Sequence, residues 1–184
     1  MKLCEGAVLA VILLAGCAPI TAVGGKLTLP DQGFEVDLPP GWYRIEAASV
    51  REALLLTKDG LPLQFIRIER VAVEKALSHT TKRFTQGMPP QEAAAVEVDN
   101  LRSGPEMADF TLLENEPANV GGRRGFRLVA TWKTKEGLRL KRIHYGFLDG
   151  PWVYRLIYQQ AAARHYFDRD LATFDVVRAS LRLL

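Results

Sequence analysis

Residues 126–159, FRLVATWKTKEGLRLKRIHYGFLDGPWVYRLIYQ, contain three apolar segments separated by two turns. The turns Lys135-Glu136-Gly137 and Asp149-Gly150 are typical of hairpins, because glycine reaches the positive φ that tight turns need. Within each segment, apolar side chains alternate with polar ones, and this period of two predicts strands. Three consecutive strands joined by short turns form an antiparallel meander. The apolar side chains of the meander and of the final segment are expected to form one core: Phe126, Leu128, Trp132, Trp152, Tyr154, Leu156, Phe167, Leu171 and Phe174.

Further strands and helices are expected on both sides of this meander. A helix is expected where apolar residues recur every three or four positions, as in the final segment from His165 to Leu181, which must pack on the sheet. The chain is therefore assigned to the α+β class. The other expected strands are 34–38, 54–57, 63–71 and 110–114, and the other expected helices are 74–86 and 91–102. The prolines and glycine after residue 38 are expected to stop the first of these strands.

Composition limits the function classes. The chain has 184 residues, of which 48% are hydrophobic and 24% charged, which fits one folded domain of ordinary size. A net charge of +3 is too small to demand a nucleic-acid partner. Two cysteines cannot form a disulfide framework, and three histidines offer little material for a metal site. We therefore expect no cofactor, no metal and no nucleic-acid partner.

The first residues have the pattern of an export signal. The apolar run Ala7–Ala15 is far shorter than the roughly 20 residues that cross a bilayer. It ends in Leu14-Ala15-Gly16-Cys17, which resembles the lipobox of bacterial lipoproteins. The resemblance implies cleavage before Cys17 and attachment of lipid to its thiol, and Cys4 would leave with the signal. The alternative is an ordinary secretory signal with an accidental cysteine.

These features predict a division of the chain into a signal, a tether and one domain. Residues 1–16 are the expected lipoprotein signal peptide, and 17–25 the lipidated N-terminus with a short tether of small residues. Residues 26–184 are the expected single domain. The expected location is a bacterial membrane, and in a Gram-negative cell the periplasmic side of the outer membrane.

Several short motifs resemble the PsbP-like family, which includes an extrinsic subunit of photosystem II and bacterial envelope lipoproteins. These motifs are Leu-Pro-Pro-Gly-Trp at 38–42, Val-Gly-Gly at 120–122, and Gly-Phe-Arg at 125–127 before the meander. The resemblance implies an antiparallel sheet flanked by helices on both faces, an α/β/α sandwich. It also implies a binding or assembly subunit rather than a catalyst.

Cationic side chains on the predicted meander form a candidate contact surface. They are expected to alternate outward from three neighbouring strands, where they could contact lipid head groups or an acidic partner. The alternative is a solvated face whose charges have acidic neighbours. The residues of this expected basic face are Arg127, Lys133, Arg139, Lys141 and Arg155.

No catalytic constellation stands out, so catalytic, cofactor-binding and metal-binding residues are all expected to be absent. No serine lies in a Gly-x-Ser-x-Gly elbow, and His165 with Asp168 would make only part of a metal site. We therefore predict a lipid-anchored, non-catalytic binding or assembly module for another envelope component. The alternative is a small hydrolase or transferase whose site is assembled only in the fold, for example near His144 and His165. A purely structural role in an envelope complex is a third possibility.

Overall fold

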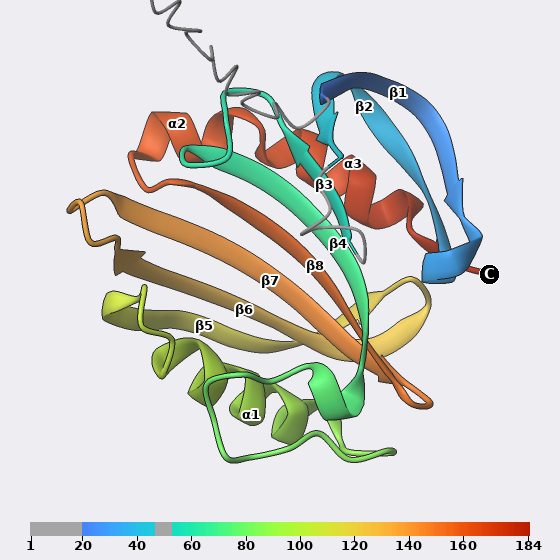
Figure 1. Ribbon diagram of the computed structural model, residues 1–184, viewed down its shortest axis with the longest axis vertical. Coiled ribbons are helices and arrows are strands. Elements are labelled where there is room, and N and C mark those ends of the chain that lie inside the picture. The colour runs from blue at the N-terminus through green and yellow to red at the C-terminus, as the bar shows by residue number, and fades with distance from the viewer. Residues whose placement is uncertain (1–19, 47–52) are drawn as a thin grey trace, which may run out of the picture.

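The computed structural model of the protein describes residues 20–46 and 53–184. The chain forms one antiparallel sheet of nine strands in the order β1-β2-β3-β4-β8-β7-β6-β5, with β9 paired to β2 (Figure 1). The strands are β1 (Ile20–Leu29), β2 (Phe34–Ile45), β3 (Ala53–Thr57), β4 (Gln64–Ala72), β5 (Ala108–Val120), β6 (Arg123–Lys133), β7 (Arg139–Asp149), β8 (Trp152–Ala161) and β9 (Arg182–Leu183). Within these residues the helices are α1 (Pro90–Arg102), α2 (Arg164–Arg169) and α3 (Leu171–Ser180), with 3-10 turns η1 (Pro30–Gln32) and η3 (Val73–Lys75).

The predicted meander is confirmed. Strands β6, β7 and β8 pair in sequence order, and their turns begin at the pairs Lys133–Arg139 and Asp149–Trp152. Gly137 and Gly150 in these turns have φ of 84° and 57°, the left-handed region that favours glycine. The hairpin of β3 and β4 is also present. Strand β5 is much longer than the predicted 110–114, because it pairs with β6 along almost its whole length.

The start of the domain differs from the prediction. Residues 20–25, predicted as tether, lie in β1, and β2 continues through Pro39, Pro40 and Gly41 instead of stopping there. The β1–β2 pairing skips residues 39–41, so the prolines lie where a missing N–H costs no sheet hydrogen bond. The strand pair thus bends at this point and continues.

The predicted helix over 74–86 is wrong. After η3 the chain is irregular, and two of its backbone amides donate hydrogen bonds to a side chain of α1. Asn100 Oδ1 accepts from the amides of Ser78 and His79 at 3.1 and 2.9 Å. Ala76 and Phe84 are buried in the cluster that α1 covers. Tertiary contacts with a neighbouring helix have replaced local helix formation.

The final helix is broken at Asp170, where the sequence predicts one continuous helix from 165 to 181. Asp170 has φ of −111° and separates α2 from α3, and β9 follows α3. The side chain of Asp170 is 4% exposed and is held by donors from other elements. These interactions stabilise a non-helical residue inside an otherwise helical pattern.

The sheet separates two hydrophobic clusters, whereas the sequence predicted one core. Leu128 belongs to one cluster and its neighbour Val129 to the other, so the clusters lie on opposite faces. The first contains Phe174 of α3 together with side chains of β2, and the second contains residues of α1. The predicted α/β/α sandwich is not supported, because the molecule is mostly sheet. The bent β1–β2 hairpin, with Phe34 and Val36, supplies much of the first cluster's cover.

Candidate functional site

The predicted lipid-attachment residue, Cys17, lies outside the described residues. Strand β1 starts only three positions later, at Ile20. No helix among the described residues is long and apolar enough to cross a membrane. The anchor therefore stays a prediction from the sequence.

The expected basic face is not one surface. Arg127, Lys133, Arg139 and Lys141 lie on the face of the first cluster, because they alternate in step with Val129 and Ile143. Arg155 lies on the opposite face and is only 8% exposed. The sequence prediction assumed that the apolar stripes of β6 and β8 share a face. The register shows that Phe126 and Leu128 point away from Tyr154 and Leu156.

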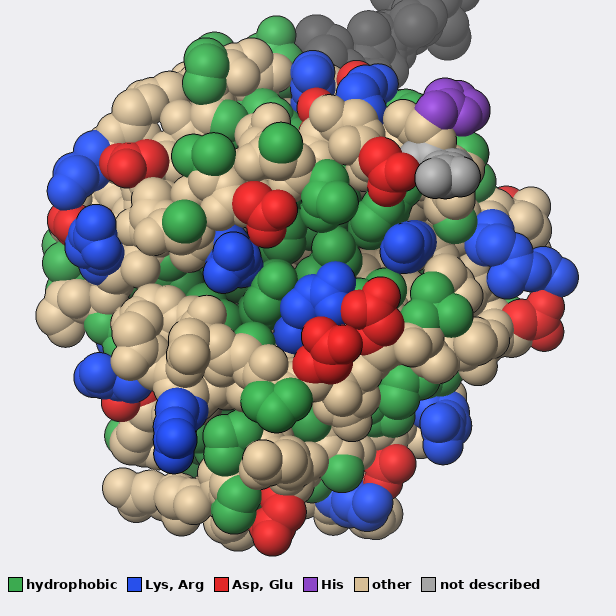
Figure 2. Space-filling model, turned by 180° about the vertical axis from the view of Figure 1, so that it is seen from behind, with side chains coloured by type: hydrophobic (Ala, Val, Ile, Leu, Met, Phe, Trp, Pro, Cys, Tyr) green, Lys and Arg blue, Asp and Glu red, His purple; other side chains and the backbone are tan. Residues whose placement is uncertain are grey.

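Two of the four cations on the first face, Arg127 and Lys133, form ion pairs with acidic side chains. Lys133 Nζ is 2.8 Å from Asp109, and this hydrogen bond lowers the pKa of Asp109. Arg127 pairs with Glu114, and Lys141 Nζ lies 4.5 Å from the centre of the Phe167 ring. Figure 2 shows acidic and basic side chains side by side on the face that it displays, with hydrophobic side chains between these charged groups. These cations remain a predicted contact surface of mixed sign.

Arg155 is the centre of a buried ionic network under α1. Its guanidinium lies 3.1 Å from Glu69 of β4 and 2.9 Å from Glu97 of α1, and it donates to the carbonyl oxygen of Ala76 at 2.6 Å. Burial lowers the pKa of Arg155, but the charges of Glu97 and Glu69 outweigh this and raise it overall. All three side chains are at most 8% exposed. The network fastens α1 and the irregular segment to the sheet.

His144 and His165, the pair suggested for an enzyme, do not come together. His144 is 1% exposed on the face covered by α1, beside the Phe126 ring, whereas His165 is exposed on α2. Burial, with the charges of Arg155 and Arg142, holds the pKa of His144 well below its usual range. Neither ring nitrogen of His144 has a hydrogen-bond partner in the described structure. His144 is therefore a neutral core residue.

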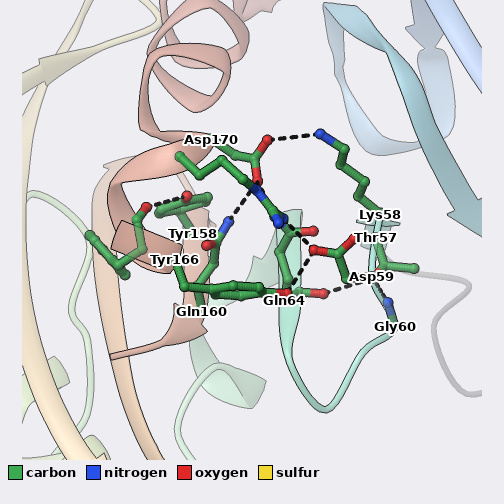
Figure 3. Close-up of polar contacts among 11 residues, drawn as sticks. Thr57, Lys58, Asp59, Gly60, Gln64, Tyr158, Gln160, Tyr166 and Asp170 are labelled. Atoms are coloured by element: carbon green, nitrogen blue, oxygen red, sulfur yellow. Dashed lines mark hydrogen bonds and ion pairs between the residues drawn. The ribbon is translucent and has the colours of Figure 1, made fainter. Parts of the chain in front are cut away.

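A second polar cluster surrounds Asp170 at the break between α2 and α3 (Figure 3). The carboxylate accepts hydrogen bonds from Lys58 at 3.1 Å, Gln64 at 2.7 Å and Arg169 at 2.9 Å. Burial raises the pKa of Asp170, but the hydrogen bonds from Arg169 and Lys58 lower it overall. The cluster ties the β3–β4 turn to the helices, and Asp59 extends it by accepting from Tyr166 at 2.7 Å. Its geometry is that of a structural clamp.

An open pocket of about 580 Å³ lies between the η1 turn and the ends of β4 and β8. Arg70 lines this pocket, and its guanidinium lies 4.3 Å from the centre of the Trp152 ring and donates to the carbonyl oxygen of Asp31 at 2.5 Å. Gly33 has φ of 70°, and a Cβ there would lie 2.5 Å from Arg70 Nη1. The turn therefore needs glycine both for its conformation and for the close approach of Arg70.

The pocket can hold a ligand by charge and by apolar contact. Arg44, Arg70 and Lys75 supply positive charge, Asp31 and Glu74 supply negative charge, and Trp152 with Leu29 supplies apolar surface. Its described lining contains no serine, threonine, cysteine or histidine. Such a mixed lining suits a polypeptide segment better than nucleophilic catalysis. No group of metal-ligating side chains occurs among the residues that the structure describes.

Sequence reasoning missed this pocket. Trp152 alternates with Tyr154 and Leu156, a pattern that predicts a core position, and Arg70 is one polar residue in a predicted strand. The turn of η1 and the end of β4 meet only in the fold, because Asp31 and Arg70 are 39 positions apart in the chain. The one signal in the sequence is Gly33, which follows Pro30-Asp31-Gln32 and indicates a turn. The sequence does not indicate that Arg70 packs against this turn.

Comparison with known proteins identifies the fold. No model of a protein family matches the chain, and no curated protein matches it. Among solved structures, it is similar to cyanobacterial PsbP (CyanoP) from Synechocystis sp. PCC 6803, at 13% identity over 96% of this chain and 99% of that one, with a TM-score of 0.58. It is similar to the Ran-binding protein Mog1p of Saccharomyces cerevisiae, at 10% identity over 89% and 96%, with a TM-score of 0.55.

A third similar structure is LpqN of Mycobacterium tuberculosis, described as involved in cell envelope biogenesis. It is 12% identical, the match covers 91% of this chain and 92% of LpqN, and the TM-score is 0.50. At these identities the comparisons establish a shared fold and no shared site. The fold is PsbP-like, and the predicted resemblance is confirmed at that level.

Proposed function

We propose that this protein is a lipid-anchored, non-catalytic binding module of the bacterial cell envelope that contacts a protein partner through the Arg70–Trp152 pocket. The observation that carries the proposal is the position of the Arg70 side chain. It is held in place by Trp152 and Asp31, yet it lines an open pocket instead of being enclosed by carboxylates. Ordered arginine and tryptophan side chains are the residues most enriched where binding energy concentrates.

The comparisons support a binding role. Mog1p is described as Ran-binding, and LpqN as involved in cell envelope biogenesis. Both share this fold, and the pocket here combines charges of both signs with an aromatic ring. A polypeptide partner fits this lining, because backbone and side-chain polar groups can pair with both signs.

The anchor is proposed from the sequence. Leu14-Ala15-Gly16-Cys17 follows an apolar run of suitable length, and only cysteine provides the thiol that receives lipid. More than one acyl chain is expected, because a single chain gives marginal and reversible membrane binding. Outer-membrane retention on the periplasmic side is proposed for a Gram-negative source.

Two assays test the proposal separately. For the anchor, the full chain is expressed with its signal, partitioned into detergent and compared with Cys17→Ser, which should move to the aqueous phase. For the pocket, the affinity-tagged protein is purified from envelopes of its source, and stoichiometric partners are quantified for Arg70→Ala. Lys135→Ala is the matched control, because this exposed cation pairs with Glu106 at the β6–β7 turn, the opposite end of the meander from Trp152. Equal partner recovery with both variants contradicts the pocket assignment.

A further inference from the structure

The side chains on the outer side of the β1–β2 hairpin are apolar at one end and polar or charged at the other. Side chains of this hairpin alternate between the first hydrophobic cluster and the outside. The outward pairs nearest the start of β1 are Ile20–Ile45 and Ala22–Tyr43, and all four are apolar or aromatic. Farther along, the outward residues Lys26, Glu35 and Asp37 are charged and Thr28 is polar, and Lys26 Nζ lies 3.0 Å from Glu35.

The apolar end of this side is accessible. Ile20 is 62% exposed and Tyr43 is 43% exposed, two of the most exposed large apolar side chains among the described residues. On the inner side, by contrast, Val23 packs against the first cluster and Trp42 is buried within it. The hairpin is therefore packed on its inner side, and only its outer side exposes these apolar side chains.

The same end of the hairpin is where the anchor enters. Three Cα–Cα steps of 3.8 Å separate Cys17 from Ile20, so these two residues are at most about 11 Å apart. A lipid on Cys17 would thus hold the start of β1 within reach of the head-group layer. Tyrosine suits that layer, because its ring is apolar and its hydroxyl remains hydrated.

We infer that the outer side of the hairpin formed by Ile20, Ala22, Tyr43 and Ile45 rests on the surface of the bilayer that holds the lipid. This inference depends on the proposed anchor at Cys17. Arg44, between Tyr43 and Ile45, points to the other side of β2 and lines the pocket. Docking of the outer side on lipid therefore leaves the pocket free for a partner.

The test measures membrane depth in the lipidated full chain, reconstituted into vesicles of phosphatidylethanolamine and phosphatidylglycerol. A nitroxide is attached to Tyr43→Cys, which is the one free thiol when Cys17 is lipidated and the signal is removed. The matched control is Val176→Cys, on the exposed surface of α3, which packs against β2 from the inner side. Collision with oxygen and with a water-soluble nickel chelate reports the depth of each label.

At position 43 we expect loss of collision with the nickel chelate and gain of collision with oxygen when the protein is on vesicles. Position 176 should show no change. Equal and unchanged accessibility at both positions, in protein that sediments with vesicles, overturns the docking inference while leaving the anchor intact. Failure to sediment, with an unmodified Cys17 thiol in the mass spectrum, overturns the anchor and the inference with it.

Discussion

Arg70 and Arg155 lie one residue apart in the β4–β8 register, on opposite faces of the sheet, and have opposite surroundings. Arg155 pairs across from Glu69, and Arg70 pairs across from Tyr154. Arg155 is enclosed by two carboxylates and a carbonyl oxygen under α1. Arg70 has one carbonyl oxygen and the Trp152 ring as neighbours, and it lines an open pocket.

The comparison indicates that Arg155 stabilises the fold, whereas Arg70 is available to bind a partner. A buried cation with all its partners inside the protein leaves no donor for a ligand, and removal of one partner leaves an uncompensated charge. An ordered arginine at the edge of an open pocket contributes less to stability but can still contact a partner. Substitutions at the two positions should therefore affect different measurements.

The largest expected effect on stability is that of Arg155→Met. It removes the ion-pair partner of buried Glu97 and leaves buried Glu69 with Arg67 alone, so we expect the free energy of unfolding to fall by about 3–5 kcal/mol. Urea denaturation followed by circular dichroism measures this change. Combining Arg155→Met with Glu69→Leu and Glu97→Leu should recover most of the loss. A loss that persists in the triple variant would show that shape, and not charge, is the main contribution.

His144 lies on the same face as Arg155, and it should make that face sensitive to acid. The pKa of His144 is held well below 6.5 in the folded protein, whereas in the unfolded chain it is close to 6.5. The unfolded state therefore binds the proton first, and stability should fall as pH drops below about 6.5, by at most about 1.4 kcal/mol per pH unit for one proton. His144→Leu should flatten the dependence of stability on pH between 7 and 5. An unchanged slope in this variant contradicts the assignment of a buried, neutral imidazole.

Arg70→Met should have a smaller effect on stability. It removes one hydrogen bond and the contact with Trp152, so we expect a loss of about 1 kcal/mol in the same denaturation assay. Recovery of the partner from envelopes should nevertheless fall sharply. If Arg70→Met is as destabilising as Arg155→Met, the two arginines do not differ in the proposed way.

The smallest effect is expected for reversal of exposed Arg139 and half-buried Lys133 and Lys141 to glutamate. Each surface substitution should change the free energy of unfolding by no more than about 0.5 kcal/mol. Partner recovery at physiological salt should not change, because none of these three cations lines the pocket and Lys133 is already paired with Asp109. Recovery that is lost on reversal, and that falls steeply with salt in the unmodified protein, would instead support the predicted basic face as the binding site.

The meander was predictable because its turns and its period of two are local properties of the sequence. The position of Arg155 was not, because alternation shows which residues share a face within a strand but not which faces of two strands coincide. That depends on register, which places Val129 opposite Ile143 and Ile143 opposite Tyr158.

The pocket was not predictable for a related reason. It forms where η1, at the far end of the β1–β2 hairpin, meets Arg70 and Trp152, and Arg70 is 39 positions from Asp31 of η1 in the chain. Similarly, the break at Asp170 depends on donors from β3–β4, which are more than a hundred residues away in the chain. Interactions between distant segments decide both features.

Site-specific photo-crosslinking in intact cells tests the central claim most directly. A benzophenone amino acid replaces Lys75, an exposed residue of the pocket lining, or Val176 on α3 as the control. We predict a discrete protein adduct from position 75 that disappears when Arg70→Met is added, and no such adduct from position 176. Adducts of equal yield at both positions, or an adduct at position 75 that Arg70→Met leaves unchanged, would contradict the account.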